Sequence, residues 1–168
     1  MERFFMRFAL RGVGNRMAMR GNGSERLVEE NLKRMVELDD AWNAQDWEKV
    51  GRFHTTDVAV FWPGGWPPTR GRRNHVEEAK EYAKTFPDNR VGNRPYRVML
   101  GQRDWTCTVA EHTGTFKGPL KTERGLIQPT GKRFSVDFCT VAHWKDGEVV
   151  EEKLFYDLIG VLKQIGAM

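Results

Sequence analysis

The sequence predicts an α+β fold in which a curved, mainly antiparallel sheet forms a conical barrel wrapped on about three N-terminal helices. Two observations support this class. Three segments of helical character lie in the first half of the chain, and four strands then follow one another without an intervening helix. This order is typical of α+β proteins, since alternating strands and helices would instead indicate a parallel sheet. A strongly twisted sheet has a concave side, so we expect an interior pocket.

The helices are predicted from capping residues and from apolar residues at helical spacing. The first begins near Glu25, and its inward side consists of Leu27, Val28, Leu32, Met35, Val36, Leu38, Asp39 and Trp42. Asp46 caps a second, short helix over residues 47–53. A third helix covers approximately residues 75–85, after Gly71 and Asn74. All three helices are therefore expected to lie on one side of the sheet.

Residues rich in β-formers predict the strands 58–62, 94–100, 104–116, 133–144 and 149–156. The segment 63–68 holds three prolines and two glycines, so it is a loop. Asp146-Gly147 lies between the last two strands and indicates a tight hairpin, because glycine accepts the positive φ that such turns need. Asp157 ends the last strand, just before an apolar closing segment with a helical ending.

Composition predicts one soluble domain, residues 25–168, preceded by a basic arm, residues 1–24. No apolar run approaches the length of a membrane span, so we expect no membrane role. The formal charge is +4, and the arm alone contributes five arginines and one glutamate. The remaining domain is formally neutral, which argues against nucleic-acid binding.

The arm and the cysteines both bear on location. Arginine at every third or fourth position of the arm argues against a secretory signal, leaving an amphipathic organelle-targeting segment or a flexible or partner-docked extension. Cys107 and Cys139 have no CxxC spacing, which favours free thiols and a cytoplasmic protein.

Several motifs carry a family resemblance that covers roughly residues 27–168. They are Ala41-Trp42-Asn43-Ala44-Gln45-Asp46-Trp47, Phe53-His54-Thr55-Thr56-Asp57-Val58, Thr113-Gly114-Thr115-Phe116-Lys117-Gly118, Pro129-Thr130-Gly131-Lys132, Trp144-Lys145-Asp146-Gly147-Glu148-Val149-Val150-Glu151-Glu152, Asp157 and Gln164-Ile165-Gly166. With these, the chain resembles the SnoaL-like polyketide cyclase and ester cyclase group of the nuclear transport factor two-like superfamily. That superfamily hosts several reactions as well as plain binding proteins, so the resemblance is more specific for fold than for chemistry.

The resemblance implies a conical barrel with an apolar pocket, often dimeric through the outer sheet face. In the cyclases an Asp near the end of the last strand is the general acid and base, a His on the preceding strand assists, and no metal or organic cofactor takes part. Asp157 and His143 stand at the matching places. Two departures are Phe116, where relatives commonly have His, and Lys153, where they have an aromatic residue.

The residues themselves support these roles and also offer alternatives. Apolar neighbours would raise the pKa of a pocket-facing Asp157 and make it a base near neutral pH, whereas a solvent-facing Asp157 would be the N-cap of the closing segment. His143 can shuttle a proton, but it lies beside a turn, where exposed histidines are common. Asp137 is unusual within a strand, and it either faces the pocket or pairs with an arginine on a neighbouring strand. His112 shares the strand face of Phe116 and could replace the histidine lost there.

The expected ligand contacts are aromatic, with one cation. They comprise Trp42, Phe53, Trp62, Trp66, Phe116 and Lys153. Trp62 and Trp66 flank the proline-rich loop, which could roof the opening of the cone. His54 and His75 lie at a helix end and a helix start, so surface or capping roles are expected for them. Since no HxH or HxxxH spacing occurs, we expect no metal site.

The sequence favours a cofactor-free enzyme that moves a proton at an activated carbon of a hydrophobic, carbonyl-bearing molecule, as in an aldol-type cyclisation. Asp157 would be the base, and His143 and His112 would act at the oxygen. Three alternatives stay open at this point. One is a carrier or sensor with the same pocket, another is a hydratase or epoxide hydrolase with Asp137 and Asp157 as paired carboxylates, and the third is an interaction module that uses the outer sheet face.

Overall fold

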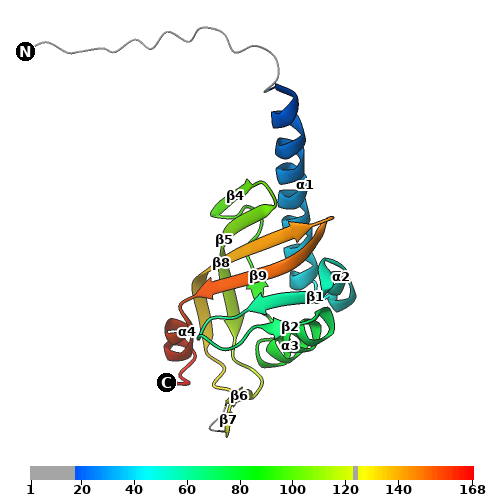
Figure 1. Cartoon of the computed structure of the whole chain (residues 1–168). Helices are drawn as coiled ribbons and strands as arrows, with labels where there is room; N and C mark the ends of the chain where they lie inside the picture. The colour runs from blue at the N-terminus through cyan, green and yellow to red at the C-terminus, as the bar shows by residue number, and fades with distance from the viewer. Residues whose placement is uncertain (1–17, 123–124) are drawn as a thin grey trace, which may run out of the picture.

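The computed structural model describes residues 18–122 and 125–168, which form four helices and nine strands. The helices are α1 (Ala18–Asn43), α2 (Trp47–Arg52), α3 (Arg72–Thr85) and α4 (Leu158–Gln164). Helices α1, α2 and α3 pack beside the sheet, and α4 lies at the C-terminus against β8 (Figure 1). None of the described helices is long and apolar enough to cross a bilayer.

The strands form one seven-stranded sheet and a separate two-stranded one. They are β1 (His54–Phe61), β2 (Thr69–Arg70), β3 (Arg90–Val91), β4 (Val98–Gln102), β5 (Trp105–Thr115), β6 (Leu120–Thr122), β7 (Gly125–Ile127), β8 (Arg133–Lys145) and β9 (Glu148–Tyr156). The main sheet has the order β2-β1-β9-β8-β5-β3, with β4 also paired to β5. Only β1 and β9 run parallel among the described pairs. The predicted α+β class is confirmed, with a curved sheet that does not close into a barrel.

Local sequence explains most element boundaries. Asp46 caps α2 by accepting a hydrogen bond from the backbone N–H of Lys49 at 3.0 Å, as predicted. Asp146 and Gly147 both adopt positive φ, which is the geometry of a tight hairpin turn, so the predicted β8–β9 hairpin is confirmed. The first helix begins at Ala18, earlier than expected, so the predicted boundary at residue 24 falls inside α1. The rest of the predicted arm lies outside the described residues.

Alternation along β5 and β8 decides which side chains reach the interior. On both strands the buried side chains are mostly even-numbered, including His112 on β5 and Phe138 and Trp144 on β8. Successive side chains of a strand point to opposite faces. The odd-numbered Asp137 and His143 therefore lie on the outer face.

The core falls into two clusters of buried apolar residues. The larger joins α1 and α2 to the concave face of β1, β8 and β9. The smaller fills the region beneath α4 and consists of Phe86, Phe116, Phe134, Val161 and Ile165. The aromatic rings of this cluster fill one end of the interior, and a cavity among the described residues is lined by members of the larger cluster.

Candidate functional site

A narrow cavity lies between the first three helices and the concave face of the sheet. Its volume is about 30 Å³, enough for about two water molecules. Five ionisable side chains of carboxylate or imidazole type line it: Asp39, His54, His75, His112 and Glu152. The remaining wall is mostly apolar, so these groups lie in an environment of low polarity.

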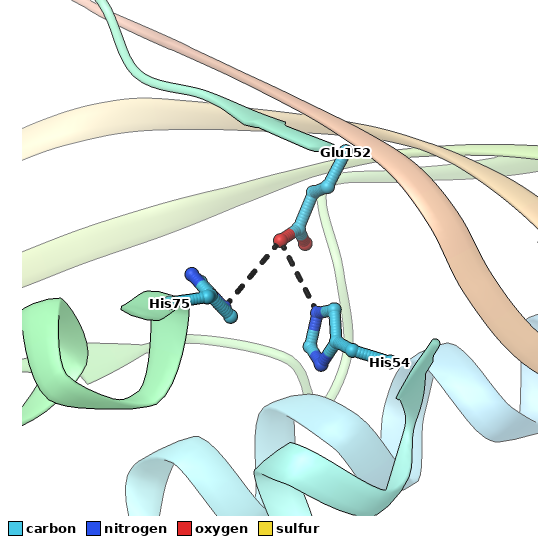
Figure 2. Close-up of side chains that lie close together, drawn as sticks. All are labelled: His54, His75 and Glu152. Carbon is cyan, nitrogen blue, oxygen red and sulfur yellow. Dashed lines mark ion pairs between the residues drawn. The ribbon is translucent and has the colours of Figure 1, made fainter. Parts of the chain in front are cut away.

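His54, His75 and Glu152 converge at one side of the cavity, and Figure 2 shows both imidazoles directed at the carboxylate. The Glu152 Oε2 atom lies 3.5 Å from His54 Nε2 and 4.0 Å from His75 Nε2. His54 begins β1, His75 lies in the first turn of α3 and Glu152 lies on β9 beside β1. Three elements distant in sequence thus build this cluster.

Burial governs the ionisation of the cluster. Burial raises the pKa of Glu152, but the neighbouring imidazoles of His54 and His75 lower it by more, so the net pKa of Glu152 is lowered. The pKa of His75 falls to about 4, first through burial and then through His54, against the attraction of Glu152. At neutral pH the cluster therefore holds an ionised Glu152 and a neutral His75.

Asp39 is a second buried carboxyl group on the cavity wall, contributed by α1. Its side chain accepts a hydrogen bond from the Tyr96 hydroxyl at 2.6 Å. Burial raises the pKa of Asp39 to about 7, helped by the charges of Glu152 and Asp40 and opposed by the Tyr96 hydrogen bond. A carboxyl group with this pKa exchanges protons at neutral pH, which general acid/base catalysis requires.

His112 lies in the cavity wall, as its strand face predicted. Its Nε2 atom is 2.8 Å from the hydroxyl of Tyr82, another wall residue. Burial lowers the pKa of His112 to about 4 and raises that of Tyr82 above its usual range. Both groups are therefore neutral at pH 7 and can exchange hydrogen bonds with an oxygen atom of a ligand.

Two tryptophans of the predicted binding set line the cavity. The indole N–H of Trp42 donates to Asn89 at 2.7 Å, and that of Trp62 donates to Glu78 at 3.0 Å. Trp62 also lines a second, more open pocket of about 400 Å³ between residues 61–65 and the end of β9. Trp62, Leu154 and Tyr156 line both spaces and so separate the cavity from this outer pocket.

The other predicted ligand contacts lie away from the cavity. Phe53 belongs to the larger core cluster and Phe116 to the smaller one. Trp66 is 58% exposed. Lys153 lies over the ring of Phe61, pairs with Glu151 at 3.0 Å and lines the outer pocket. Lys153 lies on β9, and Trp66 lies in the loop between β1 and β2.

Two predicted catalytic residues lie on the outer face of the sheet. His143 stacks on Trp105, with ring centroids 4.4 Å apart, and its Nε2 atom lies 2.8 Å from Asp104. Asp137 forms an ion pair with Arg97, one of the two placements that the sequence allowed. Neither side chain lines the cavity.

Asp157 also lies outside the cavity, and it is exposed. Its side chain accepts a hydrogen bond from the backbone N–H of Gly160 at 2.8 Å, which makes it the N-cap of α4. The structure thus shows the capping arrangement, the alternative that the sequence offered for this residue, and not the pocket position.

Sequence reasoning missed most of the cavity's ionisable groups. Asp39 belongs to the inward series predicted for the first helix, but one polar residue in such a series does not by itself indicate a cavity. Glu152 shares its strand face with Leu154, which could have indicated burial. His54 and His75 were expected at the surface or in caps, yet they are 1% and 3% exposed. No local spacing relates these residues, so only the fold brings them together.

Fold and cavity together define a class of protein: an α+β domain with acid and base groups inside an enclosed, largely apolar pocket. The family model described as SnoaL-like polyketide cyclase matches residues 33–165. The chain therefore belongs to the SnoaL-like polyketide cyclase family, and the predicted resemblance is confirmed. No curated protein matches the sequence.

Solved structures share the fold at low sequence identity. A protein described as a SnoaL-like polyketide cyclase, from Jannaschia sp. CCS1, has a TM-score of 0.74 and 22% identity, covering 84% of this chain and 95% of its own. AclR from Streptomyces galilaeus, described as a hydroxylase, has a TM-score of 0.69 and 20% identity over 84% and 87%. IdmH from Streptomyces antibioticus, described as a polyketide cyclase, has a TM-score of 0.65 and 20% identity over 81% and 98%. At such identities the likeness shows the fold alone.

Removing the Asp157 cap tests its structural role. We expect Asp157→Ala to lower the free energy of unfolding by about 0.5–2 kcal/mol, because α4 loses its side-chain cap. Asp157→Asn keeps a good capping residue, so it should stay close to wild type. Urea denaturation of both variants measures the difference, and equal stability of the two would contradict a capping role.

Asp39 should make stability depend on pH. Its folded-state pKa of about 7 lies above the unfolded value of 3.8, so the native state binds more protons between these values. The free energy of unfolding therefore falls as pH rises from about 4 to about 7. Asp39→Asn removes this loss, and its stability relative to wild type should rise by roughly 2–4 kcal/mol from pH 4 to pH 8.

Urea titrations of wild type and variant across this pH range give the difference. Asp46→Asn is the matched control, because it changes an exposed aspartate to another good N-cap residue. A stability difference between Asp39→Asn and wild type that does not change with pH would show that Asp39 titrates normally.

Proposed function

We propose that the protein catalyses proton transfer at an activated carbon of a hydrophobic, carbonyl-bearing molecule, as in an aldol-type cyclisation, with Asp39 as the general base. The observation that carries the proposal is a buried carboxyl group with a pKa of about 7 on the wall of a largely apolar cavity. Membership of the SnoaL-like polyketide cyclase family supports this reaction class. The base is thus assigned to α1 in place of the exposed Asp157.

In the proposed step, the Asp39 carboxylate removes a proton from the carbon next to the substrate carbonyl. The electron pair of that C–H bond forms an enolate, whose carbon attacks a second carbonyl carbon of the same molecule. The resulting alkoxide takes a proton back from Asp39, so the base is regenerated. Positioned general bases of this kind typically contribute about 10²–10⁴-fold to the rate.

The hydrogen-bonded pair of His112 and Tyr82 is suited to the enolate oxygen. If the Tyr82 hydroxyl donates to His112 Nε2, the His112 proton resides on Nδ1. This Nδ1 atom is buried and has no hydrogen-bond partner among the described residues. A neutral imidazole N–H can donate to a developing negative charge without itself losing a proton, which supports His112 in the role that the sequence predicted for it.

Substrate access requires motion, because about 30 Å³ is too small for a cyclisation substrate. Rotation of Trp62 would join the cavity to the outer pocket of about 400 Å³. The combined space falls within the range of small-molecule sites, roughly 300–1,000 Å³. Gly64 and Gly65, which follow Trp62 and Pro63, both have positive φ, a conformation that glycine adopts without strain. Trp62 is therefore the proposed gate.

One observation favours a second candidate, a hydratase or epoxide hydrolase. Two carboxyl groups, Asp39 and Glu152, line the same cavity, which has room for about two water molecules. The pair expected from the sequence, Asp137 and Asp157, lies on the outside. Reaction in ¹⁸O-labelled water separates the candidates, since hydration places the label in the product and cyclisation does not. The remaining alternative is a binding protein, which would retain ligand affinity without turnover.

The other expectations from the sequence stay predictions. They are a hydrophobic small molecule as the partner, a homodimer formed through the outer sheet face, and a cytoplasmic location. Light scattering of the purified chain measures the oligomeric state directly.

Hydrogen–deuterium exchange tests the assignment of the base. We expect the protein to accelerate deuterium uptake at the CH₂ group next to the carbonyl of α-tetralone, a flat aromatic ketone used as the probe. Asp39→Asn should reduce the catalysed rate by at least about 100-fold, because the amide cannot accept the proton. The wild-type rate should rise with pH through about 7 and then level off, since the carboxylate is the active form.

Mass spectrometry of the probe measures the exchange, and quenching of tryptophan fluorescence measures its binding. Asp46→Asn again serves as the control and should exchange the probe at the wild-type rate. Unchanged exchange in Asp39→Asn would exclude Asp39 as the base. Probe binding without any catalysed exchange would favour the binding protein.

A further inference from the structure

Two hydrogen-bond acceptors face each other in the cluster of His54, His75 and Glu152. The Nδ1 atom of His54 lies 2.8 Å from the backbone carbonyl of Val50, so it must carry a proton to donate there. In the neutral ring, Nε2 then has a lone pair and no proton. That lone pair lies 3.5 Å from the Glu152 carboxylate, and two acceptors at this distance repel unless a positive charge lies between them.

His75 adds a third potential ligand atom. Its Nε2 lies 4.0 Å from the same carboxylate oxygen, and one ligand atom from each of the three residues lies within 4.8 Å of the others. All three side chains are more than nine-tenths buried. Within residues 18–122 and 125–168, neither His54 Nε2 nor His75 Nδ1 has a hydrogen-bond partner. Burial without a partner is costly, so the His54 Nε2 atom, which faces Glu152, needs an occupant that the described residues do not supply.

We propose that His54, His75 and Glu152 bind a divalent first-row transition-metal ion, with Zn²⁺ as the reference ion. Two imidazoles and one carboxylate suit such ions, and zinc sites with these three ligands keep a position open for water or substrate. The open position would face the cavity, which the same three residues line. An oxygen ligand, either water or a substrate carbonyl, would complete the coordination.

Ligand atoms of a tetrahedral zinc site are roughly 3.4 Å apart, given metal–ligand bonds of about 2.0–2.1 Å. The two distances to Glu152 are 3.5 Å and 4.0 Å, and the three ligand atoms lie within 4.8 Å of one another. Binding of an ion therefore requires the cluster to contract. The hydrogen bond from His54 Nδ1 to the Val50 carbonyl already fixes the tautomer and the ring orientation, as the outer partners of metal-bound histidines do.

A proton is the competing occupant. Protonated His54 would form a buried ion pair with Glu152 and remove the repulsion between them. A proton on His54 would make no use of His75, whereas an ion would bind His75 through Nε2; the Nδ1 atom of His75 gains no partner from either occupant. The two occupants differ in a measurable way, because only the metal site binds one ion per chain.

Metal titration of the full-length, tag-free protein tests the proposal. After dialysis against a chelator, the protein is titrated with Zn²⁺ in competition with a chromophoric chelator, and separately with Co²⁺ while the visible absorption is recorded. We expect one tightly bound ion per chain and the absorption bands of Co²⁺ in a nitrogen- and oxygen-ligated site of low symmetry. No substrate is present, so the result is independent of the proposed proton transfer.

Two ligand variants and one control locate the ion. Glu152→Gln and His75→Asn should each weaken Zn²⁺ binding by at least about 100-fold, since loss of a ligand exceeds the usual effect of losing an outer partner. His143→Asn is the matched control, because His143 is also paired with a carboxylate, Asp104, but on the outer face. Its affinity for Zn²⁺ should equal that of wild type. Circular dichroism checks that each variant is folded. If Glu152→Gln does not fold, the Zn²⁺ affinity of His75→Asn tests the site by itself.

The proposal is overturned if the wild type binds no stoichiometric ion. It is also overturned if one ion binds and the affinity is unchanged in a folded ligand variant, because the ion would then lie elsewhere. Loss of the ion in His143→Asn would also overturn the proposal, because the ion would then be bound on the outer face.

Discussion

The burial of Glu152 beneath a curved sheet is the constraint on which the arrangement of the interior depends. A carboxylate taken out of water is strongly destabilised unless other groups compensate its charge. Here β9 carries Glu152 inward between β1 and β8, and the imidazoles that lower its pKa come from the start of β1 and from α3. The relative position of these elements therefore determines both the shape of the cavity and the ionisation of its wall.

The burial of Glu152 also affects the pKa of Asp39, which lines the same cavity. Ionised Glu152 adds to the effect of burial in raising the pKa of Asp39. The pKa of one carboxyl group is thus lowered by neighbouring imidazoles, while burial raises the pKa of the other to about 7. Two carboxyl groups in different environments take different chemical roles, and such a separation of their pKa values is the usual sign of an acid/base site.

Much of the fold could be predicted from sequence because its determinants are local. The Asp146-Gly147 turn, the Asp46 cap and the proline-rich loop each depend on a few adjacent residues, and all are confirmed. The start of α1 was misplaced because Gly21 and Gly23 weaken a helix without excluding it. Closure of the barrel was not predictable either, since it depends on how strongly a sheet curves over its helices.

The site was less predictable because its determinants are not local. Asp157 precedes a helix after a strand, a position that suits both a catalytic residue and an N-cap, and only its exposure separates the two. His54 and Glu152 are 98 positions apart in sequence, and their approach depends on the parallel pairing of β1 with β9. A search for metal ligands at short spacing cannot detect such a pair.

The wall of the cavity contains more ionisable groups than one proton transfer needs. Asp39, with His112 and Tyr82, accounts for removal of a proton and for binding of an oxygen atom. His54, His75 and Glu152 neither take the proton nor bind the oxygen in that step, yet they are only 1%, 3% and 6% exposed. Structural stability alone favours apolar residues at such positions, because a buried ion pair seldom stabilises a fold more than well-packed hydrophobic side chains do. A cluster that is costly to bury is best explained by a bound ligand, and its nitrogen and oxygen atoms are those that a divalent metal ion uses.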